Sequence, residues 1–250
     1  MLAIMLAAGV GRRLSGGDDR HPPKALLQLG GRSLLARHLD NLRQLPIDRL
    51  HLVVGYRRDT IEAELAALGA GDFVTPIGNP DFRKGSLVSL MAARGVLDAG
   101  EPVLFMDADV LYHPALLDRL LSSNNPDCLI FDRDFEPGDE PVKLCLKAGR
   151  PVEFRKQVEV AYDTVGEWPG FLSLSADSAR EVAAAGAAIL AEGREAEPYE
   201  EAFRAVILGD PARFHIADIT GLPWIEIDFP ADLERARREV LPLIEKAERG

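Results

Sequence analysis

Short apolar runs alternate with helical patterns through the first half of the chain. The apolar runs predict strands near 2–8, 49–55, 73–77, 102–108 and 127–132. Between them, apolar residues recur at helical spacing, and the expected helix starts are Ser33, Asp59 or Thr60, Ser86, and Pro114. Strands that alternate with helices are typical of a parallel sheet with crossover helices. The pattern therefore predicts an α/β fold of Rossmann-like type, in which helices flank a mostly parallel sheet.

The rhythm changes after about residue 133. A Glu-Pro-Gly-Asp segment interrupts it, and two strand-like runs at 142–147 and 151–158 are joined by Ala-Gly-Arg, which predicts an inserted β-hairpin. The rest predicts strands near 170–174, 213–217 and 224–228, and helices over 176–192, over 198–208 and from Pro230 onward. Pro242 is expected to kink or split that last helix. We expect a mixed sheet within a single domain over 1–250.

Composition excludes several classes of protein. A chain of 250 residues with 47% hydrophobic and 28% charged residues can bury a sizeable core, and no apolar run approaches the roughly 18 residues of a membrane span. The formal net charge of −11 disfavours nucleic acid and anionic membranes as partners. Cys128 and Cys145 form no metal-binding pattern, and the apolar opening predicts a buried strand rather than a signal peptide. These features favour a cytoplasmic protein.

A glycine-rich segment follows the first predicted strand. Residues 6–14 read Leu-Ala-Ala-Gly-Val-Gly-Arg-Arg-Leu, and Pro23-Lys24 follow. Such a turn presents backbone N–H groups to an anion without a Cβ in the way. It is neither the dinucleotide fingerprint, because Leu14 replaces the third glycine, nor a P-loop. A plain glycine turn would explain Gly-x-Gly alone, but Arg13 and Lys24 at this spacing favour a triphosphate.

Two later strands end in carboxylates. Asp107 and Asp109 close the run 103–109, at the sheet edge where open α/β sheets bind ligands. Asp228 stands at the end of another strand, in the segment Trp-Ile-Glu-Ile-Asp that begins at 224. Carboxylates with phosphate oxygens are ligands that Mg²⁺ prefers. The alternatives are that the first pair caps a turn and that Asp228 is a helix N-cap.

With these motifs the sequence resembles the nucleotidyltransferase superfamily, whose members join an NTP to a phosphorylated small molecule. The resemblance extends along essentially the whole chain and implies a GT-A-like nucleotidyltransferase fold, with an NTP-binding half over about 1–125 and an acceptor-binding half over about 126–250. It is closest to phosphocholine and aminoethylphosphonate cytidylyltransferases and to sugar-1-phosphate nucleotidyltransferases. The polar stretch 15–21 and Gly85, where the family often has Asn, depart from the pattern and leave the nucleobase open.

The resemblance also implies roles for individual residues. Arg13 and Lys24 would grip the β- and γ-phosphates, and Lys156, otherwise a solvated lysine, would meet the acceptor phosphate. Asp109 and Asp228 would hold Mg²⁺. Asp107 would bind the metal through water or orient the site. The nucleotide would contact Leu6, Ala7, Ala8, Gly9, Gly11, Asn79, Gly85 and Ser86, although Ser86 is equally a helix cap.

A further set of residues is expected to shape the acceptor pocket. Its acids would accept hydrogen bonds from a hydroxyl or ammonium group, and its aromatics would give packing or cation–π contact. The alternative is a turn followed by an ordinary amphipathic helix. The five histidines lack ligand spacing and receive no role. The acceptor set consists of Lys143, Glu167, Trp168, Gly170, Tyr199 and Glu200.

The expected activity is Mg²⁺-dependent transfer of a nucleotidyl group with release of pyrophosphate. CTP with phosphocholine or 2-aminoethylphosphonate is the first choice, and a sugar 1-phosphate with UTP or another NTP is the second. Asp107-Ala108-Asp109 also fits an Asp-x-Asp glycosyltransferase, but its nucleotide-sugar donor has no γ-phosphate for Arg13 and Lys24 to hold. A non-catalytic nucleotide-binding module is a further alternative, and a homodimer stays open.

Overall fold

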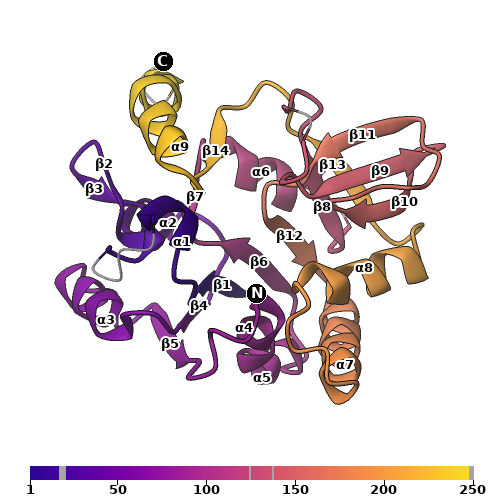
Figure 1. Ribbon diagram of the computed structural model, residues 1–250, viewed down its shortest axis with the longest axis horizontal. Coiled ribbons are helices and arrows are strands. Elements are labelled where there is room, and N and C mark those ends of the chain that lie inside the picture. Colours follow the sequence, from indigo (N-terminus) through magenta and orange to yellow (C-terminus); the bar gives the residue numbers. More distant parts are fainter. Residues whose placement is uncertain (17–20, 124, 137, 248–250) are drawn as a thin grey trace.

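A seven-stranded mixed sheet forms the centre of the computed structural model (Figure 1). The structure describes residues 1–16, 21–123, 125–136 and 138–247, so that 17–20 of the polar stretch lie outside the described residues. All neighbouring strands are parallel except β12, which is antiparallel to both β6 and β8. This confirms the predicted mixed, mostly parallel sheet. The strand order is β13 (His215–Asp218), β8 (Cys128–Phe131), β12 (Phe171–Leu174), β6 (Val103–Asp107), β1 (Leu2–Ala7), β4 (Arg49–Val54) and β5 (Val74–Gly78).

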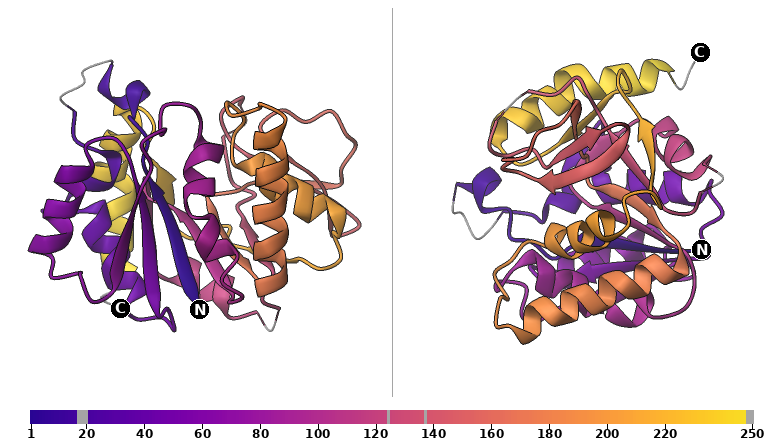
Figure 2. Two further views of the ribbon diagram at one scale, coloured as in Figure 1. Left: turned by 90° about the horizontal axis from the view of Figure 1, so that it is seen from below. Right: turned by 90° about the vertical axis from the view of Figure 1, so that its right-hand side faces the viewer.

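The sheet is buried on both faces, which explains why its strands are nearly continuous apolar runs. Along β1, Ala3 and Met5 join the core on one face, whereas Ile4 joins the core on the other. Figure 2 shows helix α7 and the C-terminal helices on opposite sides of the sheet. The first core holds α2 (Leu34–Leu42), α3 (Arg58–Ala67) and α6 (Ala115–Leu121), and the second holds α4 (Ser86–Ala92), α5 (Arg94–Leu97), α7 (Ala176–Ala191) and α8 (Glu200–Gly209).

The observed helix starts agree only in part with those predicted from the sequence. Ser33 caps α2, because its Oγ accepts the Ala36 N–H at 3.1 Å. The expected cap at Asp59 or Thr60 is wrong: α3 follows Arg57, whose φ is +47°, and the Thr60 hydroxyl instead donates to the Arg57 carbonyl. A left-handed residue thus takes the place of a side-chain cap at this helix.

The inserted hairpin is part of a three-stranded antiparallel sheet. Strands β9 (Lys143–Lys147) and β10 (Arg150–Arg155) form the predicted pair, and β11 (Thr164–Glu167) adds to the other edge of β9. Strand β11 was not predicted because its four residues carry a single apolar side chain larger than glycine. Because β10 ends at Arg155 rather than near 158, Lys156 directly follows the strand.

The C-terminal segment returns to the centre of the molecule. Strand β14 (Trp224–Glu226) pairs antiparallel with β7 (Val110–Tyr112), which directly follows β6. The closing helix then runs as α9 (Pro230–Arg235), a π-helical stretch over Ala236–Val240, and α10 (Leu241–Ala247). The helix continues through Pro242, and the irregularity expected there takes the form of the π-helical stretch, which ends two residues before a proline that has no N–H to donate. The remaining elements are α1 (Arg12–Ser15), a 3₁₀ turn (Lys24–Leu26), β2 (Gln28–Leu29) and β3 (Arg32–Ser33).

Two further predictions concern cysteines and membranes. Cys128 and Cys145 are both buried and free, which agrees with the absence of a disulfide scaffold. No helix in the described ranges combines the length and apolar character that crossing a bilayer requires.

Candidate active site

Three carboxylates converge where β6 and β14 end. One oxygen each of Asp109, Glu226 and Asp228 lies within 4.8 Å of the others. The pairing of β14 with β7 brings them together, and the Ile227 N–H donates to the Asp109 carbonyl at 3.0 Å. Hard carboxylate oxygens suit Mg²⁺, which takes one or two of them together with phosphate oxygens. The structure thus joins the two predicted metal ligands and adds Glu226, which the sequence analysis missed.

The spacing along β14 could have revealed Glu226. Residues two apart on a strand face the same side, so Glu226 and Asp228 share a face at the strand's end. Although part of the Glu226 side chain reaches solvent, dehydration of its carboxyl group and the charges of Asp109 and Asp228 raise its pKa above the ordinary value. The raised pKa reflects repulsion among the three carboxylates, which a bound cation would relieve.

Lys24 lies inside this cluster. Its Nζ donates to Asp109 Oδ2 at 2.8 Å and to an oxygen of Asp228. Burial disfavours the ammonium, but the two carboxylates outweigh burial and raise the pKa of Lys24. Gly11 makes this placement possible: its φ is +65°, and a Cβ there would lie 3.3 Å from Lys24 Cγ. The second glycine of the loop thus leaves room for a lysine that stays protonated.

Arg13 reaches the same cluster from helix α1. Its Nη1 lies 3.0 Å from Asp228 Oδ2 and 2.7 Å from Glu140 Oε2. The same Glu140 oxygen lies 3.3 Å from Lys156 Nζ. Glu140, which the sequence analysis did not single out, therefore connects the predicted NTP-phosphate arginine with the predicted acceptor-phosphate lysine. A carboxylate takes the position between two cations that a phosphate group could take in a complex.

Asp107 stands apart from the carboxylate cluster. The Tyr199 hydroxyl donates to its Oδ2, and a Cβ on Gly170 would lie only 2.7 Å from the same oxygen. Desolvation of this half-buried carboxyl and the negative charge of Asp109 raise the pKa of Asp107 well above its ordinary value. Among the described residues, the cluster able to hold a metal contains Asp109 but not Asp107. The two aspartates of the Asp-x-Asp pair therefore have different surroundings, since Asp109 lies in the carboxylate cluster and Asp107 accepts from Tyr199.

His38 supports the turn that carries these aspartates. It lies buried on α2, with Nε2 at 3.1 Å from the Ala108 carbonyl and Nδ1 at 3.4 Å from the Tyr112 hydroxyl. Burial lowers the pKa of His38 to about 4, so the neutral ring donates from Nε2 to the carbonyl. In the sequence, this buried role of His38 could have been inferred from its position among leucines on the apolar face of a predicted helix.

The predicted nucleoside segment is tied to the loop before α8. The N–H of Tyr199 donates to Ser86 Oγ at 3.0 Å, and a Cβ on Gly85 would lie 2.3 Å from the Glu195 carbonyl oxygen. Ser86 is the first residue of α4 and caps nothing, so the capping alternative is wrong. Asn79 is buried. Its Nδ2 donates to Ser89 Oγ and its Oδ1 accepts the Asp81 N–H, each at 3.0 Å. These contacts shape the segment from within.

The loop after β1 places the other predicted nucleotide contacts. Strand β1 ends at Ala7, the Ala8 carbonyl accepts the Tyr56 N–H at 3.1 Å, and the Leu6 carbonyl accepts the Ala108 N–H at 3.2 Å. A Cβ on Gly9 would meet no atom of the described residues within 4 Å. The space where a Gly9 side chain would lie is thus open.

Several predicted acceptor residues are structural instead. Trp168 is 4% exposed, its ring stands edge-on to Phe154 at 5.0 Å, and its indole donates to the Phe171 carbonyl. Tyr199 is buried against Asp107, and Lys143 Nζ donates to the carbonyls of residues 138 and 156. Neither aromatic ring offers a face to a ligand in this structure. The expectation that Trp168 and Tyr199 give the acceptor packing or cation–π contact is therefore corrected.

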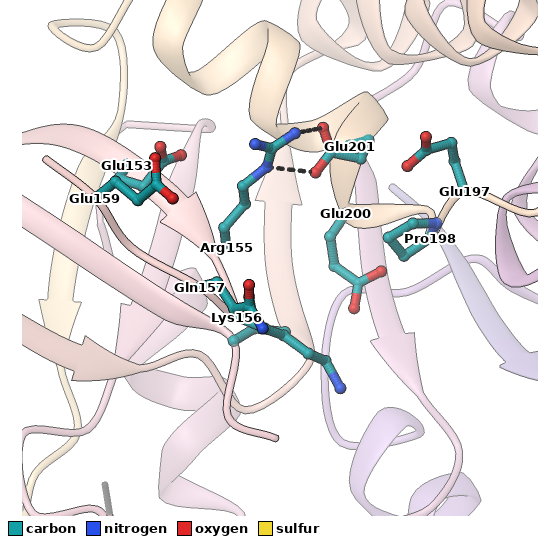
Figure 3. A pocket seen from close by; sticks show the side chains of 10 residues that line it. Glu153, Arg155, Lys156, Gln157, Glu159, Glu197, Pro198, Glu200 and Glu201 are labelled. Carbon is teal, nitrogen blue, oxygen red and sulfur yellow. Dashed lines mark hydrogen bonds and ion pairs between the residues drawn. The ribbon is translucent and has the colours of Figure 1, made fainter. Parts of the chain in front are cut away.

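Two other predicted acceptor residues, Glu167 and Glu200, line open cavities. Glu167 lines a cavity of about 610 Å³ together with Asp132, Glu226 and Asp228. Desolvation and the charge of Asp132 raise the pKa of Glu167 to about 7. Glu200 and Lys156 line a second cavity of about 420 Å³ (Figure 3). The first cavity therefore adjoins the carboxylate cluster, and the second adjoins Lys156, the predicted acceptor-phosphate lysine.

The Asp228 N-cap alternative can also be decided. The backbone N–H groups of Asp228 and Phe229 donate to Asp232 Oδ2 at 3.0 and 2.7 Å, so Asp232 satisfies the start of α9. The Asp228 carboxylate is thereby free to bind Lys24 and Arg13.

Known proteins resemble this chain along most of its length. The CMP-5'-(3-aminopropyl)phosphonate synthase of Streptomyces rubellomurinus is 28% identical over 252 residues, which cover 94% of this chain and 38% of that protein. The bifunctional IPC transferase and DIPP synthase of Rubrobacter xylanophilus is 29% identical over 244 residues, which cover 96% of this chain and 52% of that protein. The chain thus spans about half the length of these curated relatives, or less.

A solved structure shows the same fold. The inositol-1-phosphate CTP transferase from T. maritima has a TM-score of 0.76 at 22% identity, and the alignment covers 99% of this chain and 96% of that one. The predicted nucleotidyltransferase fold is confirmed. Residues 3–168, more than half of the chain, match the MobA-like NTP transferase domain. The protein therefore belongs to the family of MobA-like NTP transferase domains.

Proposed function

We propose that this protein is a Mg²⁺-dependent nucleotidyltransferase that joins an NTP, with CTP as first choice, to a small phosphorylated acceptor. The observation that carries the proposal is Lys24 held between Asp109 and Asp228, beside Glu226 and Arg13. Such a site, next to a glycine-rich turn, suits a metal-bound triphosphate. The names of the relatives, a CMP-phosphonate synthase and a CTP transferase, support CTP.

The reaction needs positioning and charge neutralisation more than proton transfer. An oxygen of the acceptor phosphate or phosphonate, already ionised near neutral pH, attacks the α-phosphorus in line with the leaving group. One P–O bond forms, the bond between the α-phosphorus and the bridging oxygen breaks, and pyrophosphate leaves. No general base is required.

The charged side chains divide this work. Arg13 and Lys24 bind the β- and γ-phosphates and stabilise the departing pyrophosphate, and Lys156 binds the acceptor phosphate. When bound by Asp109, Asp228 and Glu226, Mg²⁺ supplies neutralisation of the phosphate charge. Binding of both substrates replaces the contacts that Glu140 makes with Arg13 and Lys156. In this scheme, residues 1–125 mainly bind the NTP and residues 126–250 the acceptor, with Asp228 crossing over to the metal.

Two classes of acceptor are in question. Aminoalkyl phosphonates and phosphocholine are the first choice, and the phosphonate in the name of the Streptomyces relative supports it. Sugar or polyol 1-phosphates are the second, favoured by the likeness to the inositol-1-phosphate CTP transferase. Cytoplasmic location and a homodimer stay predictions.

The test is a matrix of the four NTPs against 2-aminoethylphosphonate, phosphocholine, inositol 1-phosphate and glucose 1-phosphate. Pyrophosphate release is measured with Mg²⁺ or with EDTA, and mass spectrometry identifies the nucleotidyl product. We expect release that depends on both Mg²⁺ and an acceptor, fastest with CTP. Absence of release with every pair, from protein that still binds an NTP, would leave the non-catalytic module as the better reading.

A further inference from the structure

The cavity beside Lys156 lies between the end of β10 and the start of α8 (Figure 3). Its volume is about 420 Å³, enough for a small organic group, and its walls are mostly charged or polar. Lys156 lies on one wall, so the cavity adjoins the position proposed for the acceptor phosphate. What lines the rest of it therefore bears on the organic part of the acceptor.

Most charged groups around this cavity are already paired. Arg155 donates from Nε and Nη2 to the two oxygens of Glu201, each at 2.8 Å. Arg204 donates to both oxygens of Glu153, at 2.6 and 3.1 Å. Paired two-point contacts of this kind orient both partners firmly. They join β10 to α8 and fix the walls.

Glu200 differs from these acids. Its Oε2 is buried and has no hydrogen-bond partner among the described residues. In Figure 3 its carboxylate points away from the Arg155–Glu201 pair, toward the side on which the Lys156 chain ends. Burial raises the pKa of Glu200, although its own backbone N–H and the charge of Lys156 act in the opposite direction. A buried acceptor oxygen without a donor is unfavourable and rare in native structures.

We propose that Glu200 binds the primary ammonium group of a zwitterionic acceptor, an aminoalkyl phosphonate or phosphate whose anionic end lies at Lys156. This inference rests on the proposed nucleotidyltransferase function. A primary ammonium supplies the N–H donor that Oε2 lacks and brings a positive charge into direct contact with the carboxylate, in addition to the nearby Lys156. A neutral hydroxyl supplies the donor without the charge, and a quaternary ammonium supplies the charge without the donor. The cavity thus presents the Lys156 ammonium to the anionic end of the substrate and the Glu200 carboxylate to its cationic end.

The experiment compares 2-aminoethylphosphonate with 2-hydroxyethylphosphonate, its neutral analogue, in the presence of CTP and Mg²⁺. The wild-type protein should use the amine with a kcat/KM about tenfold higher or more. Glu200→Gln should lower kcat/KM for the amine about tenfold, mainly through KM, and change that for the hydroxyl analogue by less than about twofold. CTP binding should not change.

Two controls separate recognition from folding. Glu192→Gln removes the same charge from an exposed residue outside the cavity, where the Glu192 carboxylate accepts a hydrogen bond from Arg194 at 3.0 Å, and it should leave the use of both acceptors unaffected. The thermal midpoint of Glu200→Gln should match that of the wild type. Phosphocholine adds a third substrate, which should be poorer than the primary amine.

Several results would overturn the inference while the reaction class stands. These are equal use of amine and hydroxyl analogue by the wild type, preference for phosphocholine or inositol 1-phosphate, or an equal loss for both phosphonates in Glu200→Gln. If no pair of substrates releases pyrophosphate, the proposed reaction fails instead. Calorimetry with 2-aminoethylphosphonate then decides the site: binding about tenfold weaker in Glu200→Gln supports it, and unchanged binding refutes it.

Discussion

Replacement of Gly170 by alanine probes how tightly the site is built around Asp107. Gly170 has a φ of +87°, and a Cβ there would lie 2.7 Å from Asp107 Oδ2 and 3.2 Å from Asp107 Cβ. Asp107 cannot easily yield, because its carboxyl accepts the Tyr199 hydroxyl and the Asp107 N–H donates to the Gly170 carbonyl at 3.1 Å. The substitution thus adds both backbone strain and a steric clash.

Gly149 provides a matched control. Its φ is +74°, yet a Cβ there would meet no atom of the described residues within 4 Å. Gly149→Ala should therefore cost only the left-handed strain, about 1–2 kcal/mol. Gly170→Ala carries the same strain and an overpacking cost of about 1–3 kcal/mol. For a chain of this size the difference between the two variants corresponds to roughly 2–12 °C in Tm.

The assay is urea unfolding together with a thermal scan of both variants. Gly170→Ala should lose more free energy of unfolding than Gly149→Ala, and the excess should shrink in an Asp107→Ala background, where the nearest oxygen is gone. Equal losses in the two glycine variants, or an excess unchanged without the Asp107 carboxyl, would refute the steric reasoning.

Three further predictions test the charged groups. Asp109→Ala or Asp228→Ala should lower kcat about 100-fold or more with the fold intact, because the metal loses its anchorage; near-normal turnover with circular dichroism unchanged would refute this assignment. Lys24→Ala should chiefly impair use of the NTP, and Lys156→Ala should chiefly impair use of the acceptor. KM is measured separately for each substrate, and if Lys156→Ala raised KM for the NTP alone, the role assigned to Lys156 would be wrong. Glu140→Gln should tighten pyrophosphate binding by up to about fivefold, because an exposed ion pair is removed; calorimetry showing weaker binding would instead make Glu140 a supporting residue.

Local patterns carried most of the fold prediction. The run of residues 2–8 became β1, and Pro242 marked the irregular stretch in the last helix. The glycine-rich loop was also recognisable from residue types alone, since Gly11 leaves room for Lys24. In each case the controlling interactions lie within the segment or follow from residue type, so the sequence expresses them directly.

Long-range contacts account for what was missed. Arg13 and Glu140 are 127 residues apart, and Tyr199 and Asp107 are 92 apart. Glu226 joins the carboxylate cluster because β14 pairs with β7. A sequence pattern cannot show which of many exposed acids meets a given cation, since that depends on how distant strands register.

By itself the sequence determined the alternation of strands and helices, the glycine-rich loop and the aspartates at the strand ends, because apolar periodicity and turn chemistry are local properties. Only the tertiary structure decided which way side chains point. It turned Trp168 into the core and left one oxygen of Glu200 buried without a donor. The direction of a side chain depends on the packing of neighbouring elements, because the side chain turns toward the space that its surroundings leave open.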